Sequence, residues 1–132
     1  MKSIEDIMTK NIITIDSKAN VVDAAKKLEK NKEVCLIVKE GKETVGIVTE
    51  RDIVYKYLAK KNNLQVKDIM SRPIIDLSLE KNKNIMDAIL IMHKNKIKKL
   101  AIKKNGKIVG ILCEGFLPKF CIDTVKKPSQ YN

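Results

Sequence analysis

An internal repeat is the feature that most constrains the fold of this chain. The segment Ile4–Thr9 matches Val66–Ser71 at an offset of 62 residues, and Val45–Ile47 matches Val109–Ile111 at an offset of 64. We place the two extra residues of the second copy in the polar loop from Ser78 to Asn84. Repetition at a fixed period predicts two copies of one supersecondary unit.

Each copy has the same pattern of apolar residues. In the first, short apolar runs at 12–15, 34–38 and 44–48 predict strands, and helical spacing predicts a helix over 21–30, with Asn20 as a cap. A closing helix carries Ile53, Val54, Tyr57 and Leu58. In the second copy, Asn105-Gly106 predicts a hairpin turn. The predicted order is β-α-β-β-α, twice, in an α+β (mixed α/β) fold.

The expected bounds are 1–60 for the first repeat, 61–65 for a polar linker, 66–125 for the second repeat and 126–132 for a frayed tail. One unit of this size buries too small a fraction of its surface to be stable alone. We therefore expect both repeats to pack as one pseudo-twofold module.

Charge and cysteine content narrow the function classes. The net charge is +11, which would attract anions, but only two of the 27 basic residues, Arg51 and Arg72, are arginines. Arginine is the usual reader of bases and phosphates, so nucleic-acid binding is a weaker alternative that rests on charge alone. Three cysteines without CxxC spacing indicate reduced thiols. With no apolar run of transmembrane length, we expect a cytoplasmic protein with no membrane partner.

The repeated motifs resemble the CBS domain, named after cystathionine β-synthase, in its usual tandem pair. The carriers are Asp6–Thr9 and Gly46–Asp52, which recur in weaker form as Asp68–Ser71 and Gly110–Phe116. The resemblance implies two sheet-and-helix units with clefts that bind AMP, ADP, ATP or S-adenosylmethionine as ligands, with no other cofactor. It also implies a stand-alone regulatory module, without catalytic machinery, that acts on an unknown effector protein.

The same resemblance implies roles for individual residues. Gly46 would let the backbone approach the ligand, Thr49 and Asp52 would meet the ribose, and Arg51 could reach a phosphate. Lys98 and Lys99 would face that cleft from the second repeat, and adenine would stack near the segment after Thr9. These residues make up the implied ligand site: Lys10, Asn11, Ile12, Ile13, Gly46, Thr49, Arg51, Asp52, Lys98 and Lys99. In the second repeat Cys113 and Phe116 replace the hydroxyl and the acid, so we expect one working cleft, in the first repeat.

Simpler interpretations stand beside these roles. Thr49 could be only a helix cap, and Asp52 only a favourable charge at a helix start. Gly46 could serve close packing, and Arg51, Lys98 and Lys99 could be solvated surface residues. His93, the single histidine, has no visible partners for a metal site.

The second copy's first helix suggests a partner. Residues Ile85 to Met92 are apolar almost all round, which is typical of a helix buried on both sides. A homodimer through this helix is the expectation, and deeper burial within one chain is the alternative. A ligand-independent dimeric interaction module is therefore the second functional hypothesis.

Overall fold

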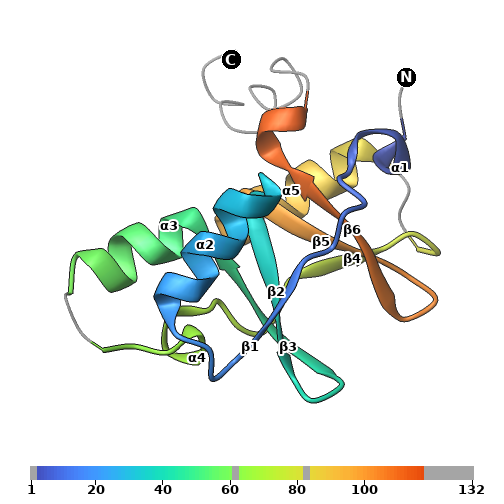
Figure 1. Cartoon of the computed structure of the whole chain (residues 1–132). Helices are drawn as coiled ribbons and strands as arrows, with labels where there is room; N and C mark the ends of the chain where they lie inside the picture. The colour runs from blue at the N-terminus through green and yellow to red at the C-terminus, as the bar shows by residue number, and fades with distance from the viewer. Residues whose placement is uncertain (1–2, 61–62, 82–83, 118–132) are drawn as a thin grey trace, which may run out of the picture. The chain divides into compact units, whose positions relative to one another are not determined.

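The computed structural model describes residues 3–60, 63–81 and 84–117. Within these ranges the chain forms two three-stranded sheets, ordered β1-β2-β3 and β4-β5-β6, with helices between the strands (Figure 1). The α+β class and the repeated order of elements are confirmed. The part of the second repeat after Leu117, where its closing helix is predicted, lies outside the described residues, as do Cys121 and the tail 126–132.

The elements of the first repeat follow the predicted pattern closely. They are α1 (Ile4–Ile7), β1 (Thr14–Asp16), α2 (Val21–Asn31), β2 (Cys35–Glu40), β3 (Glu43–Thr49), α3 (Glu50–Asp52) and a π-helical continuation, η1 (Ile53–Leu58). Asn20 caps α2 as predicted, because its side chain accepts a hydrogen bond of 2.8 Å from the Asp23 amide.

The second repeat copies this order. Its elements are α4 (Val66–Ile69), β4 (Asp76–Ser78), α5 (Ile85–Asn95), β5 (Lys99–Lys104), β6 (Lys107–Cys113) and a single 3-10 turn, η2 (Glu114–Phe116). Asn105 and Gly106 both have positive φ, 53° and 76°, which is the backbone conformation of the predicted hairpin turn. The short helices α1 and α4 are an addition, since the sequence pattern assigned no element to the opening motifs.

Strand pairing is also the same in the two sheets. The first strand of each pairs in parallel with the second, and the second pairs antiparallel with the third, with Ile37 opposite Ile47 and Ala101 opposite Ile111. One irregularity interrupts each hairpin, at Val38/Lys39 and at Ile102/Lys103. The register of the first sheet brings Thr49 opposite Cys35, at the end of β3 where the candidate site begins.

The compact units of the structure differ in their bounds from the sequence repeats. One unit comprises 13–74, and the other comprises 1–12 with 75–132. Ile4 and Met8, which open the first repeat, are buried in the cluster formed by the second repeat. Val66, Ile69 and Met70, which open the second, are buried in the cluster of the first. The opening segment of each sequence repeat therefore completes the hydrophobic core formed by the strands and helices of the other repeat.

Backbone pairing holds each exchanged segment in place. Ser71 and Ile47 exchange two backbone hydrogen bonds, of 2.9 and 3.1 Å, and Thr9 and Ile111 exchange two of 2.8 and 2.9 Å. Gln65, the last residue of the predicted linker, forms an isolated antiparallel β-bridge with Asn20. The repeat boundaries 1–60 and 66–125 remain a description of the sequence pattern, and the compact units follow the exchange.

Candidate functional site

A capping box fixes the carboxylate of Asp52 where β3 gives way to α3. Thr49 has extended backbone angles, φ −116° and ψ 167°, and its side chain accepts a hydrogen bond of 3.3 Å from the Asp52 amide. In return, Oδ2 of Asp52 accepts from the Thr49 amide at 2.9 Å and from the Thr49 hydroxyl at 3.2 Å. The capping role of these two residues is therefore confirmed. Their role toward a ribose stays a prediction.

Lys56 forms an ion pair with the other oxygen of the Asp52 carboxylate. Its ammonium lies 2.9 Å from Oδ1 of Asp52, and it also donates to the carbonyl of Ile69 at 3.1 Å. The Asp52 side chain is only 8% exposed, whereas Lys56 is 44% exposed. Both carboxylate oxygens thus have protein partners. A ligand hydroxyl can reach Oδ1 only if Lys56 shares it or leaves.

Lys56 is absent from the residues selected by sequence. It lies four positions after Asp52, a spacing at which opposite charges meet on a helix. The i, i+4 rule applied to the closing helix would have found it.

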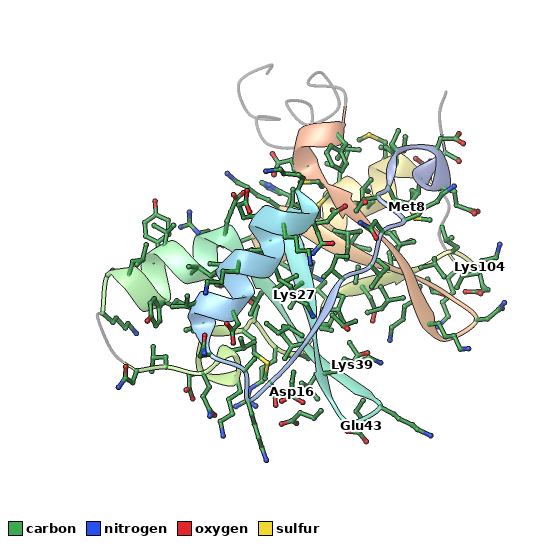
Figure 2. The ribbon with its side chains drawn as sticks, viewed as in Figure 1. Met8, Asp16, Lys27, Lys39, Glu43 and Lys104 are labelled. Carbon is green, nitrogen blue, oxygen red and sulfur yellow. The ribbon has the colours of Figure 1, made fainter. Side chains whose placement is uncertain are left out.

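Gly46 is explained by protein packing. A Cβ atom at this position would lie 2.6 Å from the sulfur of Met70 and 3.0 Å from the carbonyl oxygen of Ser71. The other unit repeats the arrangement, with Gly110 against the sulfur of Met8, whose position Figure 2 labels. These close approaches need glycine. The interpretation in which the glycine serves close packing is therefore supported, and an approach to a ligand is not needed to explain it.

Arg51 is exposed, and its guanidinium lies 4.6 Å from the ring centroid of Tyr55, four residues along the helix. This is a cation–π contact. A role toward phosphate would require the side chain to leave that ring, and it stays a prediction.

The remaining predicted residues are divided between the two units. Lys10 and Asn11 are exposed and Ile12 is half-buried in the unit that also holds Lys98 and Lys99. The other unit, 13–74, contains Ile13, Gly46, Thr49, Arg51 and Asp52. A cleft shared by Asp52 and the two lysines is therefore an expectation that spans both units, and it stays a prediction.

The second repeat lacks the capping box at the matching place. Cys113 takes the position of Thr49 and makes no side-chain cap, and the following residues form one 3-10 turn instead of a longer helix start. Phe116, in the position of Asp52, is 46% exposed. The loss of both polar partners at this position accounts for the different local structure, because neither a thiol nor a phenyl ring makes the reciprocal hydrogen bonds.

A pocket of about 320 Å³ lies in the unit that comprises 1–12 and 75–132. It is lined by Ile89, Met92, His93, Lys96, Ile97, Lys98, Glu114 and Leu117. In the other unit, Ile53 and Tyr57 of η1 pack against the core cluster that includes Leu28, the counterpart of Met92. The counterparts of most of η1 lie outside the described residues, so we assign no ligand to this pocket.

Two further features of the described ranges bear on chemistry. No cluster of three or more His, Cys, Asp or Glu side chains in 3–60, 63–81 and 84–117 is arranged to hold a metal ion. Over the same ranges, none of the helices has both the length and the apolar character needed to cross a membrane.

Comparison with known proteins identifies the family. The model of the CBS domain matches residues 4–59 and 66–115. This chain belongs to the CBS domain family and contains a pair of its domains. An uncharacterized protein of Methanopyrus kandleri is 32% identical over 115 residues, and the match covers 83% of this chain and 58% of that relative. The chain thus spans little more than half the length of that protein.

An enzyme also appears among the relatives. Inosine-5'-monophosphate dehydrogenase of Korarchaeum cryptofilum is 31% identical over 113 residues, but the match covers only 23% of its length. The similarity is to a part of that enzyme.

Solved structures show the same fold. A crystal structure of a CBS domain protein superposes with a TM-score of 0.77 at 28% identity, covering 92% of this chain and 98% of that one. A CBS domain pair in complex with 5'-methylthioadenosine and S-adenosyl-L-methionine superposes with a TM-score of 0.77 at 26% identity, covering 91% and 95%. These ligands belong to that protein.

Proposed function

We propose that this chain is a regulatory module that binds an adenine nucleotide or adenosyl ligand at Asp52 of the first repeat. The observation that carries the proposal is the fixed orientation of the Asp52 carboxylate, held by Thr49 at the end of β3. A carboxylate at such a position can accept the paired hydroxyls of a ribose, as acidic residues do in dinucleotide-binding folds. The adenosyl ligands of the similar CBS domain pair support this ligand class.

The asymmetry of the repeats supports a single site of this kind per chain. The first repeat keeps Thr49 and Asp52, whereas Cys113 and Phe116 cannot form the same carboxylate position. Lys98 and Lys99 would meet the phosphates, and Lys10, Asn11, Ile12 and Ile13 would line the adenine position. Because the module has no catalytic role in this proposal, its output passes through a partner protein.

Calorimetric titration with AMP, ADP, ATP and S-adenosylmethionine tests the proposal. We expect at least one to bind, and Asp52→Asn to weaken binding by about 1.5–3 kcal/mol, the usual range for hydrogen bonds to a charged group. Asp68→Asn is the matched control, because Asp68 also accepts from a backbone amide, that of Gln65 at 2.8 Å, in a capping box. No binding of any ligand at millimolar concentration, or equal losses in both variants, would contradict the proposal.

A ligand-independent dimeric module is the second candidate. Val54, Tyr55 and Leu58 on η1 are 47%, 60% and 58% exposed, which is unusual for adjoining apolar residues on one helix. The helix predicted to form the dimer, α5, exposes less apolar surface. Four of its apolar residues are buried in their own unit (Ile85, Ala88, Ile89 and Met92), and Leu90 is 52% exposed. If this candidate is right, light scattering will show the mass of a dimer with and without nucleotides. The melting temperature in thermal unfolding will also not change when nucleotides are added.

A further inference from the structure

Lys56 contacts one group four residues before it in the sequence, the Asp52 carboxylate, and one group in α4, the carbonyl of Ile69. Its ammonium contacts Oδ1 of Asp52 at 2.9 Å and the carbonyl of Ile69 at 3.1 Å, and all three residues belong to the unit 13–74. Ile69 ends α4, the segment through which the second repeat completes the core of the first. One side chain therefore joins the candidate ligand site to the exchanged segment.

The two oxygens of Asp52 differ in how firmly they are held. Oδ2 has the amide and the hydroxyl of Thr49, which are fixed by the end of β3. Oδ1 has an ammonium at the end of a flexible side chain that is 44% exposed. An ion pair with one exposed member is weak and is screened by salt. Oδ1 is thus the oxygen that an incoming donor can take.

We propose that Lys56 is an internal competitor for the ligand position on Asp52, and that ligand binding releases it from Ile69. This inference rests on the proposed function and adds its regulation. A ribose hydroxyl that donates to Oδ1 displaces the ammonium, because the buried carboxylate has little other exposed surface. The carbonyl of Ile69 then loses its side-chain donor, so ligand binding changes a hydrogen bond at the last residue of α4.

Adenosine is the sharpest probe, because it carries the ribose hydroxyls and no phosphate that Lys56 could attract. We expect Lys56→Met to bind adenosine more tightly than the wild-type protein by about fivefold, the factor that matches an ion pair of this exposure. Lys56→Arg, which keeps a cation within reach of Asp52, should bind as the wild type does. Lys60→Met is the control for net charge, since Lys60 is exposed one turn further along the chain.

Salt gives a second test on the unmodified chain. Raising the sodium chloride concentration weakens the Lys56–Asp52 pair and leaves neutral adenosine unaffected. The affinity of the wild type for adenosine should therefore rise with salt, and that of Lys56→Met should stay constant. If Lys56→Met changed only the free energy of unfolding, the salt dependence of adenosine affinity would be the same in the wild type and in the variant.

The carbonyl 13C chemical shift of Ile69 reports the link to α4. On saturation with adenosine, the wild-type shift should move toward the value that ligand-free Lys56→Met shows, and the shift in the variant should stay in place. Equal affinities of wild type and Lys56→Met, or an unchanged Ile69 shift, would overturn the role of Lys56 and leave the ligand site standing. If neither protein bound adenosine or any adenine nucleotide at millimolar concentration, the ligand site and the role of Lys56 would both be wrong.

Discussion

At the scale of single residues, the caps and turns of this chain depend on neighbours a few positions away, whereas the packing at Gly46 depends on a distant residue. The cap at Asn20 and the turn at Asn105-Gly106 were predictable because the cause lies within a few residues of the effect. The reciprocal bonds of Thr49 and Asp52 follow the same local rule. Gly46 differs, because its partner Met70 is 24 positions away and belongs to the other repeat's opening motif. No local pattern reveals such a contact.

The Gly46–Met70 contact leads to a prediction about stability. Gly46→Ala should destabilise the protein by about 1–3 kcal/mol, since the added methyl group overpacks a site already closed by a sulfur and a backbone carbonyl. Combining it with Met70→Ala should cost less than the sum of the two single changes. Urea unfolding monitored by circular dichroism measures all three.

Gly115→Ala is the matched control, because a Cβ there meets nothing within 4 Å and the backbone angle is ordinary. Additive effects of Gly46→Ala and Met70→Ala would show that the two residues do not share the contact.

At the scale of elements, the predicted strands and the helices α2 and α5 were confirmed because each carries its own periodic apolar pattern. The opening helices α1 and α4 have four residues each, too few for periodicity to indicate them. The two residues added in the second repeat fall in the Ser78 to Asn84 loop, by alignment of the repeats. Glu80 ties that loop to the neighbouring hairpin, because it accepts from the Asn105 amide at 2.6 Å.

Glu80 gives the stability of this loop a pH dependence. The hydrogen bond from the Ser78 hydroxyl, and after it that from the Asn105 amide, lower the pKa of Glu80 from 4.5 to about 2. Because the folded value is the lower one, the ionised carboxylate adds stability above pH 4.5, and this contribution is lost as the pH falls toward 2. Glu80→Gln should therefore lower the melting temperature at pH 6, and the difference from the wild type should shrink as the pH falls toward 2.

Ser78→Ala checks the cause. Removing the hydroxyl donor should raise the pKa of Glu80 toward its ordinary value in an NMR titration of the carboxyl carbon. An unchanged titration in Ser78→Ala would contradict the assigned cause.

At the scale of the whole molecule, the duplication predicted two copies of one supersecondary unit and the motif resemblance predicted the family, but neither predicted the exchange of opening segments. Alignment shows that Met8 matches Met70, but it cannot show which sheet each one covers. The structure answers this for each unit: Met8 lies in the cluster with Leu100 and Leu112, and Met70 in the cluster with Leu36 and Val48. The ligand site at Asp52 stays a prediction that rests on family resemblance, since local chemistry accounts for Asp52 as a cap.

The exchange predicts how fragments behave. A chain cut between residues 62 and 63 yields two pieces, and each lacks the segment that completes its own core. We expect each piece alone to unfold without a cooperative transition and an equimolar mixture to regain one. Two cooperative transitions from the separate pieces would show that the exchanged segments are dispensable.

In the proposed function, the first repeat holds the ligand through Asp52 and the second repeat does not use its matching position. Amide NMR spectra recorded during titration with AMP, or with whichever adenine ligand binds most tightly, distinguish the two positions. We expect saturable shifts across residues 46–52 that disappear in Asp52→Asn, and no comparable shifts across 110–116. Shifts confined to 110–116, or shifts across 46–52 that persist in Asp52→Asn, would show that Asp52 does not hold the ligand.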